Sequence, residues 1–479
     1  TSAFSGEVLT LKANAALPPG LIRQEAPEGA AAADLYHERL RPQFHFTPRR
    51  GWNNDPNGLV LLDGVWHLFF QHNPFGVNWG NMHWGHAVSR DLCHWQELPL
   101  ALFPKSLSDM AFSGCALVDQ GNSAGFAPAG ETALVAAFTS TGRGQCLAYS
   151  LDGGATLQEY AHNPVIPYLE TGSNQNRDPK IIRYAEHWVM IVYEEVPAPG
   201  GEWERGYAIY TSLDLKNWKR TDFLPGWFEG PELFELELEG KPVWVIHGCL
   251  WQGARSAFLL GDFDGQTFTP RAGPFAAHNG PAFYAAQNFN NTAGRVIMLG
   301  WLAGAAYPEM PFSQGMTVPL ELSLRPGAGG APQLCFNPVA EFESLRHNTI
   351  RALNLNFEQV NWLLQDMGAE LVDVELGLEA QDLLRVEFGE QVLECDFAQG
   401  ELRFGDTQSG LSRAAFTLQE GRLELRLLVD RGVVEVFAQG GAVAFAARNL
   451  RPEGQPVVKL AGEGKVKKLG LHTLKSIWD

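Results

Sequence analysis

Short apolar runs separated by turn residues make up most of the chain. Runs rich in Val, Ile, Phe, Tyr and Trp, such as 66–70, 188–193 and 243–246, are bounded by clusters of Gly, Asn, Asp and Pro. Apolar positions that keep a helical period over several turns are scarce. Because β-branched and aromatic residues favour strands, and turn formers separate one strand from the next, this pattern predicts an all-β protein.

A weak repeat indicates how the strands are grouped. A Ser-x-Asp or Asp-x-Asp turn followed by an apolar or aromatic residue recurs, with its last residue at Asp91, Asp152, Asp214 and Asp264. These positions are 61, 62 and 50 residues apart, a period that suits a four-stranded propeller blade. Four marked units and a closing one predict five blades, which we place at residues 35–335.

The pattern changes on both sides of this region. Residues 1–34 are rich in Ala, Pro and Gly and are expected to form an N-terminal extension without chemistry of its own. Residues 336–346 are expected to be a linker with a short helical segment. From 347 to 479, apolar and charged residues alternate, as in 423–429, which predicts a β-sandwich domain.

Composition limits the functions that the chain can have. The 479 residues, 45% of them hydrophobic, suffice for large cores in two or more domains. A net charge of −18 argues against nucleic acids and anionic membranes as partners and fits a neutral substrate such as a sugar. No run of 18 apolar residues indicates a membrane helix, and the compartment, secreted or cytoplasmic, is left open.

Neither cysteines nor histidines indicate a metal site. The six cysteines lack the spacing of metal ligands and lie mostly in apolar, strand-like segments, so we expect buried free thiols. His83 and His86 are three residues apart, but no third or fourth ligand accompanies them. We therefore expect no metal and no cofactor.

Three acidic residues stand beside prolines in segments rich in turn formers. Asp55 lies in WNNDPNG, Asp178 in RDPK and Glu229 in FEGPE, at intervals of 123 and 51 residues. Each acid alone could merely cap a turn. Together they match retaining glycoside hydrolysis, which needs a carboxylate nucleophile and a carboxylic acid. Loops at one end of a propeller can bring such distant residues together.

Further motifs accompany these acids along residues 35–479. They are PQFHF at 42–46, WGNMHWGH at 79–86, FSG at 112–114, FYAAQ at 283–287, GW at 300–301 and VEVF at 434–437. With the three acidic segments, this ordered set resembles glycoside hydrolase family 32, the invertases, levanases and inulinases. The resemblance implies a five-bladed β-propeller followed by a C-terminal β-sandwich.

The resemblance also implies roles for individual residues. Asp55 would be the nucleophile, Asp178 the transition-state stabiliser and Glu229 the acid/base. The residues expected to line a fructose pocket are Asn54, Gln71, Trp79, Phe112, Ser113, Arg177 and Trp301. The protein would then be a retaining glycoside hydrolase that releases fructose from β-fructofuranosides of the sucrose, inulin or levan type.

Two positions depart from the family pattern, and other functions remain open. Gly230 stands where the family usually has Cys, and Asn53 where Met or Leu is usual. A fructosyltransferase would use the same three acids and pass the fructosyl group to a sugar hydroxyl. A non-catalytic fructan-binding protein would not need Glu229 beside a rigid proline. The sequence distinguishes neither sucrose from inulin and levan, nor exo from endo attack, nor the oligomeric state.

Overall fold

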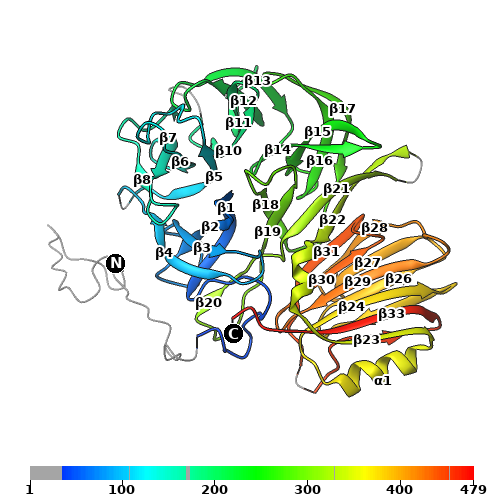
Figure 1. Ribbon diagram of the computed structural model, residues 1–479. Coiled ribbons are helices and arrows are strands. Elements are labelled where there is room, and N and C mark those ends of the chain that lie inside the picture. The colour runs from blue at the N-terminus through cyan, green and yellow to red at the C-terminus, as the bar shows by residue number, and fades with distance from the viewer. Residues whose placement is uncertain (1–34, 107, 169–172, 328–329, 453, 479) are drawn as a thin grey trace.

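Strands form nearly all of the regular structure in the computed structural model, which describes residues 35–106, 108–168, 173–327, 330–452 and 454–478. Five sheets stand around a central axis, and two further sheets pack together beside them (Figure 1). The prediction of a five-bladed β-propeller followed by a β-sandwich is therefore confirmed. The expected N-terminal extension, residues 1–34, lies outside the described residues. Within the described part, no helix is long and apolar enough to cross a membrane.

The chain builds each blade from consecutive antiparallel strands. The first blade holds β1 Gly51–Leu62, β2 Val65–Asn73, β3 His83–Ser89 and β4 Gln96–Leu102. The second holds β5 Ala111–Asp119, β6 Ala133–Ser140, β7 Gly144–Ser150 and β8 Gln158–Glu159, with β9 Ile166–Pro167 also paired to β7. The third holds β10 Arg177–Tyr184, β11 His187–Pro197, β12 Trp203–Ser212 and β13 Lys219–Pro225.

The last two blades follow the same plan. The fourth holds β14 Glu232–Leu238, β15 Lys241–Gly248, β16 Ala257–Phe263 and β17 Phe268–Ala276. The fifth holds β18 Phe283–Asn288, β19 Ile297–Leu302, β21 Leu320–Pro326 and β22 Pro332–Pro338. The first strands are innermost (Figure 1), where β5 lies against β1 and β10, β18 against β1, and β14 against β10. All six cysteines are buried and unpaired, as expected.

The repeated turn found in the sequence occupies the same place in four blades. It joins the third strand to the fourth, after β3, β7, β12 and β16. In the first blade Ser89 Oγ donates to Asp91 Oδ1 at 3.0 Å, and the second and third blades repeat this contact at 2.7 and 3.1 Å. In the fourth, Asp264 accepts from two backbone N–H groups. The repeat is thus a turn motif that closes the outer hairpin of a blade.

Short contacts from the fifth blade close the ring. The two-residue strand β20 Phe312–Ser313 pairs in parallel with β1, and Asn290 exchanges backbone hydrogen bonds with Leu59 and Leu61. Asn53 adds to this closure, because its buried amide, with the nitrogen facing β20, donates to the carbonyl oxygens of Ser313 and Gln314 at 3.3 and 3.2 Å. The amide of Asn53 therefore has hydrogen-bond partners at a position where the family usually has Met or Leu.

Two sheets and one helix form the C-terminal unit. One sheet has the order β23 Arg346–Leu355, β33 Lys465–Leu474, β24 Val372–Glu379, β29 Leu423–Val429, β30 Val433–Ala438, β31 Val443–Arg448. The other has the order β28 Gly410–Ala415, β27 Glu401–Asp406, β26 Val392–Asp396, β25 Leu383–Glu387, β32 Lys459–Ala461. Helix α1 Phe357–Met367 begins at a capping box of Asn356 and Gln359. The 3-10 helix η4 Ala340–Leu345 follows β22, and the exact domain limits at 335 and 347 remain a prediction.

A buried cluster of charges, here called the joint, links the propeller to the sandwich. His45 Nδ1 lies 2.9 Å from Asp430 Oδ2, and His45 Nε2 lies 3.2 Å from Glu435 Oε2. The backbone N–H groups of Gln43 and Phe44 also donate to Asp430. Burial opposes the charged imidazole, but the two carboxylates raise the pKa of His45 to about 9. The motifs PQFHF and VEVF, at opposite ends of the sequence, meet here.

Candidate active site

The three acids named from the sequence lie together at one end of the propeller axis. Asp55 is on β1, Asp178 is the second residue of β10, and Glu229 stands three residues before β14. The negative charges of Glu229 and Asp55 both raise the pKa of Asp178. Arg177 contacts Glu229 at 2.9 Å and lies 4.0 Å from Asp178. The beginnings of neighbouring inner strands thus unite residues that are far apart in the sequence.

Asp55 is directed into the site by an irregular stretch of strand. The pairing of β1 with β2 shifts register on both sides of Pro56, as in a β-bulge, which re-aims side chains. Ser113 Oγ donates to Asp55 Oδ2 at 2.6 Å, and Asn54 Nδ2 donates to Oδ1 at 3.0 Å. Burial raises the pKa of Asp55 to about 6, against the effect of the Ser113 hydrogen bond and with the help of the Glu229 charge.

Asp178 is held deep in the site by a strained backbone. Its φ of +65° is a left-handed conformation, although Pro179 follows it, and β10 shifts register at this point. Its N–H donates to Thr139 Oγ1 at 3.1 Å, and Gly230 N–H donates to its Oδ2 at 3.1 Å. Burial raises the pKa of Asp178 above its ordinary value, while Arg177 opposes the shift.

Glu229 is more accessible than Asp178. Its side chain is 24% exposed, compared with 8% for Asp178. Arg177 donates to Oε2 through Nε and Nη2 at 3.0 and 2.9 Å, and the Tyr284 hydroxyl donates to Oε1. The Arg177 guanidinium also lies 5.2 Å from the Phe228 ring centre. Arg177 is an ion-pair partner of Glu229, and its contact with a substrate stays a prediction.

Backbone geometry explains the glycine beside this acid. Gly230 has a φ of +69°, a conformation that favours glycine, and its N–H bonds to Asp178. A Cβ at this position would meet nothing closer than Ala285 Cα at 3.9 Å. Space for a side chain is therefore present, and the conformation is what favours glycine.

The remaining predicted pocket residues surround the acids at the same end of the blades. Gln71 Nε2 donates to the Ala111 carbonyl at 2.9 Å, beside the segment that carries Phe112 and Ser113. The Trp79 ring lies 6.2 Å from Phe112. The Trp301 ring lies 6.1 Å from those of both Trp52 and Tyr284. Aromatic side chains and the three acids therefore occupy the same end of the propeller, a combination that suits a sugar ring and its hydroxyls.

Comparison with known proteins places this chain in a family. The N-terminal domain of glycosyl hydrolases family 32 matches residues 45–338, and the C-terminal domain of that family matches residues 392–472. The chain belongs to glycoside hydrolase family 32. It is 33% identical to a levanase of Bacillus subtilis (strain 168), over 94% of this chain and 72% of the relative.

Solved structures of the family share the fold. The exo-inulinase from Aspergillus awamori has a TM-score of 0.81 at 28% identity, over 92% of this chain and 100% of its own. The β-fructofuranosidase from Schwanniomyces occidentalis, complexed with fructosyl-erythritol, has a TM-score of 0.79 at 24% identity, over 94% and 100%. At that identity the second comparison shows the fold alone.

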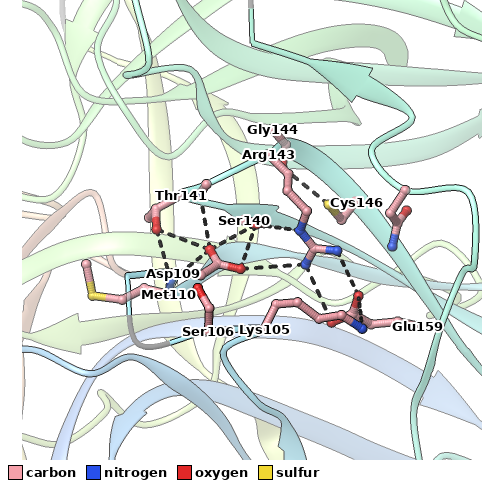
Figure 2. A network of polar contacts seen from close by, with 12 residues as sticks. Lys105, Ser106, Asp109, Met110, Ser140, Thr141, Arg143, Gly144, Cys146 and Glu159 are labelled. Atoms are coloured by element: carbon pink, nitrogen blue, oxygen red, sulfur yellow. Dashed lines mark hydrogen bonds and ion pairs between the residues drawn. The ribbon is translucent and has the colours of Figure 1, made fainter. Parts of the chain in front are cut away.

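A polar network around Asp109 and Arg143 lies in the second blade of this family 32 protein (Figure 2). Asp109 accepts hydrogen bonds from Ser140 Oγ at 2.9 Å and from the N–H groups of Met110 and Gly142 at 2.8 and 3.1 Å. Arg143 flanks the carboxylate at 3.7 Å and pairs with a glutamate on its other side. This network anchors Asp109, which lies just before β5 and four residues before Ser113, to the end of β6 and the turn that follows it.

A buried ion pair lies close to the acids along the chain. Lys180 Nζ is 2.9 Å from Glu232 Oε2 and 2.7 Å from the Asn288 carbonyl, which ties β10, β14 and β18 together. Lys180 follows Asp178 by two residues, and Glu232 follows Glu229 by three. The pair therefore fixes the inner strands from which two of the acids project.

Sequence reasoning missed several of these contacts. Tyr284 lies in the recognised FYAAQ motif but received no role, although its hydroxyl reaches Glu229. Asp109 lies outside the motifs, and Lys180, although it ends the RDPK motif, received no role; their partners Ser140 and Glu232 are distant in sequence. The two neighbouring histidines also have separate partners, since His86 contacts His67 and His83 contacts the Asn81 carbonyl. Among the residues that the structure describes, no cluster of His, Cys, Asp or Glu is arranged to hold a metal ion.

Proposed function

We propose that this family 32 protein is a retaining β-fructofuranosidase that releases fructose from fructosides of the sucrose, inulin or levan type. The observation that carries the proposal is the meeting of Asp55, Asp178 and Glu229 at one end of the propeller. The likeness to a levanase and to an exo-inulinase supports the same substrate class. The fructoside is the expected partner, and each step below uses only side chains of the chain and water.

Asp55 is the proposed nucleophile. Hydrogen bonds from Ser113 and Asn54 fix its carboxylate without placing a cation in direct contact with it. With a pKa of about 6, the carboxylate is mostly ionised near neutral pH. It would attack the anomeric carbon of a terminal fructosyl unit and form a covalent fructosyl-enzyme ester.

Glu229 is the proposed acid and base. It is more exposed than Asp178 and is oriented by Arg177 and Tyr284. It would protonate the departing oxygen in the first step. In the second step it would take a proton from the water that hydrolyses the ester. This step is the first step in reverse, with water in place of the departing sugar, so the same residue serves first as acid and then as base.

Asp178 is the proposed stabiliser of the transition state. Its carboxylate is held by Gly230 N–H and by a strained backbone, so little reorganisation is needed when charge develops. Its negative charge would oppose the positive charge of an oxocarbenium-like ring. Such a contact strengthens as the ring distorts, and so it favours the transition state over the bound substrate.

Product analysis tests this proposal. The protein is incubated separately with sucrose, inulin and levan, and the products are separated by chromatography. Free fructose from at least one substrate is expected, and Asp55→Asn should release none at the same enzyme concentration. Lengthened products would indicate a fructosyltransferase instead. Binding without any product would indicate a fructan-binding protein, and neither binding nor product would contradict the substrate class.

A further inference from the structure

Exposed tryptophans are concentrated on one face of the propeller. Among the described residues, the large exposed hydrophobic side chains include four tryptophans: Trp79, Trp203, Trp251 and Trp362, at 54, 36, 41 and 61% exposure. The first three belong to blades one, three and four, and Trp362 lies on α1 of the sandwich. Large apolar side chains left in water are costly and often mark binding surfaces.

The three propeller tryptophans share one structural position. Trp79 lies between β2 and β3, Trp203 begins β12 after the turn from β11, and Trp251 lies between β15 and β16. Each is thus at the connection from the second strand of a blade to the third. Since the first strands begin at the acids and the second strands return antiparallel to them, these connections lie on the face that holds the site.

A continuous set of contacts leads from Glu229 outward to Trp251. Phe228 precedes Glu229, and its ring centre lies 5.3 Å from that of Trp251. Arg177, which holds the Glu229 carboxylate, lies over the other aromatic partner of Phe228, Tyr193, at 4.8 Å. Trp251 therefore contacts the aromatic ring of the residue next to the proposed acid.

Trp251 is held in place before any ligand arrives. Its backbone N–H donates to the Gly226 carbonyl at 3.0 Å. The Leu250 N–H donates to the Ala254 carbonyl, also at 3.0 Å, and closes the turn that carries Trp251. The Arg205 guanidinium lies 4.1 Å from the centre of the ring and is fixed by an ion pair to Glu195 at 2.9 Å. A fixed aromatic surface loses little conformational entropy when it binds a ligand.

We propose that Trp251, supported by Arg205, binds the second sugar on the leaving-group side of the scissile bond. This inference rests on the proposed function, because it takes Glu229 as the group that protonates the departing oxygen. The leaving sugars must then extend past Glu229, toward Phe228 and Trp251. The apolar face of a sugar ring can pack on the indole, and the guanidinium N–H groups can donate to its hydroxyls.

The consequence is a preference for chains over a disaccharide. Sucrose offers one leaving sugar and does not reach Trp251, whereas a fructo-oligosaccharide such as nystose does. Binding energy from this remote contact would favour cleavage of the longer substrate. The substrate class that fits this face is therefore a fructan or a fructo-oligosaccharide.

The ratio of kcat/KM for nystose to kcat/KM for sucrose tests the inference. Trp251→Ala should lower this ratio about tenfold, and Trp251→Phe, which keeps an aromatic ring, should lower it less. Trp362→Ala, a matched exposed tryptophan on the sandwich, should not change it. Calorimetry with Asp55→Asn as the background should show about tenfold weaker nystose binding when Trp251→Ala is added.

The outcomes separate this inference from the proposed function. An unchanged ratio in Trp251→Ala, with wild-type protein that cleaves both substrates, overturns the inference and leaves the proposed function standing. An equal fall with Trp362→Ala also overturns it, because exposure alone would then explain the effect. Wild-type protein that cleaves neither substrate overturns the proposed function and the inference with it.

Discussion

Asp55 in the site and Asp430 in the joint are both carboxylates near other charges, yet their surroundings differ. Asp430 accepts backbone hydrogen bonds from Gln43, Phe44 and Arg431 and contacts the imidazole of His45. Asp55 accepts only two side-chain hydrogen bonds, and the Glu229 charge acts against its ionisation. The charge of Asp430 is balanced by backbone donors and by the imidazole of His45. Asp55 has fewer hydrogen-bond donors and no such cation in direct contact.

The difference shows how one chain uses buried charge for two purposes. In the joint, one imidazole between two carboxylates connects two domains, and removal of His45 would leave both buried carboxylates without their cationic partner, which is strongly destabilising. In the site, an under-compensated carboxylate has a raised pKa and stays available to a substrate. Under the proposed function, the raised pKa of Asp55 would serve the reaction at a cost in stability, whereas Asp430 would contribute to stability alone.

Asp55→Asn should give the largest effect. Loss of the nucleophile should lower kcat about 10⁴-fold, while the melting temperature should not fall, because a poorly compensated buried charge is removed. Turnover of sucrose or inulin measures the fall in kcat, and thermal unfolding measures the melting temperature. Activity within tenfold of wild type, or a clear loss of stability, would contradict the contrast between site and joint.

Asp430→Asn should show the opposite behaviour. We expect the free energy of unfolding to fall by about 3 kcal/mol, because His45 loses one of its two buried anionic partners and the N–H groups of Gln43 and Phe44 lose a charged acceptor. The turnover number per folded molecule should remain near that of wild type. Urea unfolding measures the loss, and Asp91→Asn, in a half-exposed turn, is the control with a smaller expected loss. A large fall in kcat would show that changes in the joint affect the reaction at the site.

The joint should also make stability depend on pH. Because the pKa of His45 is raised from 6.5 to about 9, its contribution is fully present below pH 6.5 and is lost as pH rises through 9. The free energy of unfolding should fall by on the order of 2 kcal/mol across this pH window. Melting temperatures between pH 6.5 and 9 measure it, and the decline should be shallower in Asp430→Asn. Equal slopes in both proteins would remove His45 as the cause.

The site should impose a different pH dependence, on rate. Since Asp55 must be ionised to attack and its pKa is about 6, kcat/KM should fall about tenfold per pH unit below 6. Ser113→Ala removes a hydrogen bond that favours the ionised form, so this limb should move to higher pH. Rate profiles from pH 4 to 8 measure the shift. A limb that moves to lower pH would contradict the assignment of Asp55.

Gly230→Ala should give the smallest effect. A side chain at a φ of +69° should cost about 1 kcal/mol of stability. Gly421→Ala, at a φ of +77° with open space around it, is the matched control and should cost a similar amount. Only Gly230→Ala should also lower kcat, because relief of the strained backbone would shift the N–H that donates to Asp178. Equal activity in both variants would show that the backbone at position 230 does not position Asp178 for the reaction.

The architecture was predictable because its signals are local. Alternating apolar residues indicated strands, and the turn at Asp91 and its counterparts recurs because each blade needs the same outer hairpin. Asp55, Asp178 and Glu229 could be named because prolines and other turn formers surround them. The pairing of Arg177 with Glu229 could not be named, since the two are 52 residues apart and lie on neighbouring blades.

The amino-acid sequence alone determined the strand-rich architecture, the acidic surface and the identity of the three acids. The tertiary structure alone decided that Tyr284 reaches Glu229, that Asp109 accepts a hydrogen bond from Ser140, and that His45 meets Asp430 across 385 residues. The physical reason is that strands and turns depend on neighbouring residues. The partner of a charge, and hence its pKa, depends on which strands the packed blades place side by side.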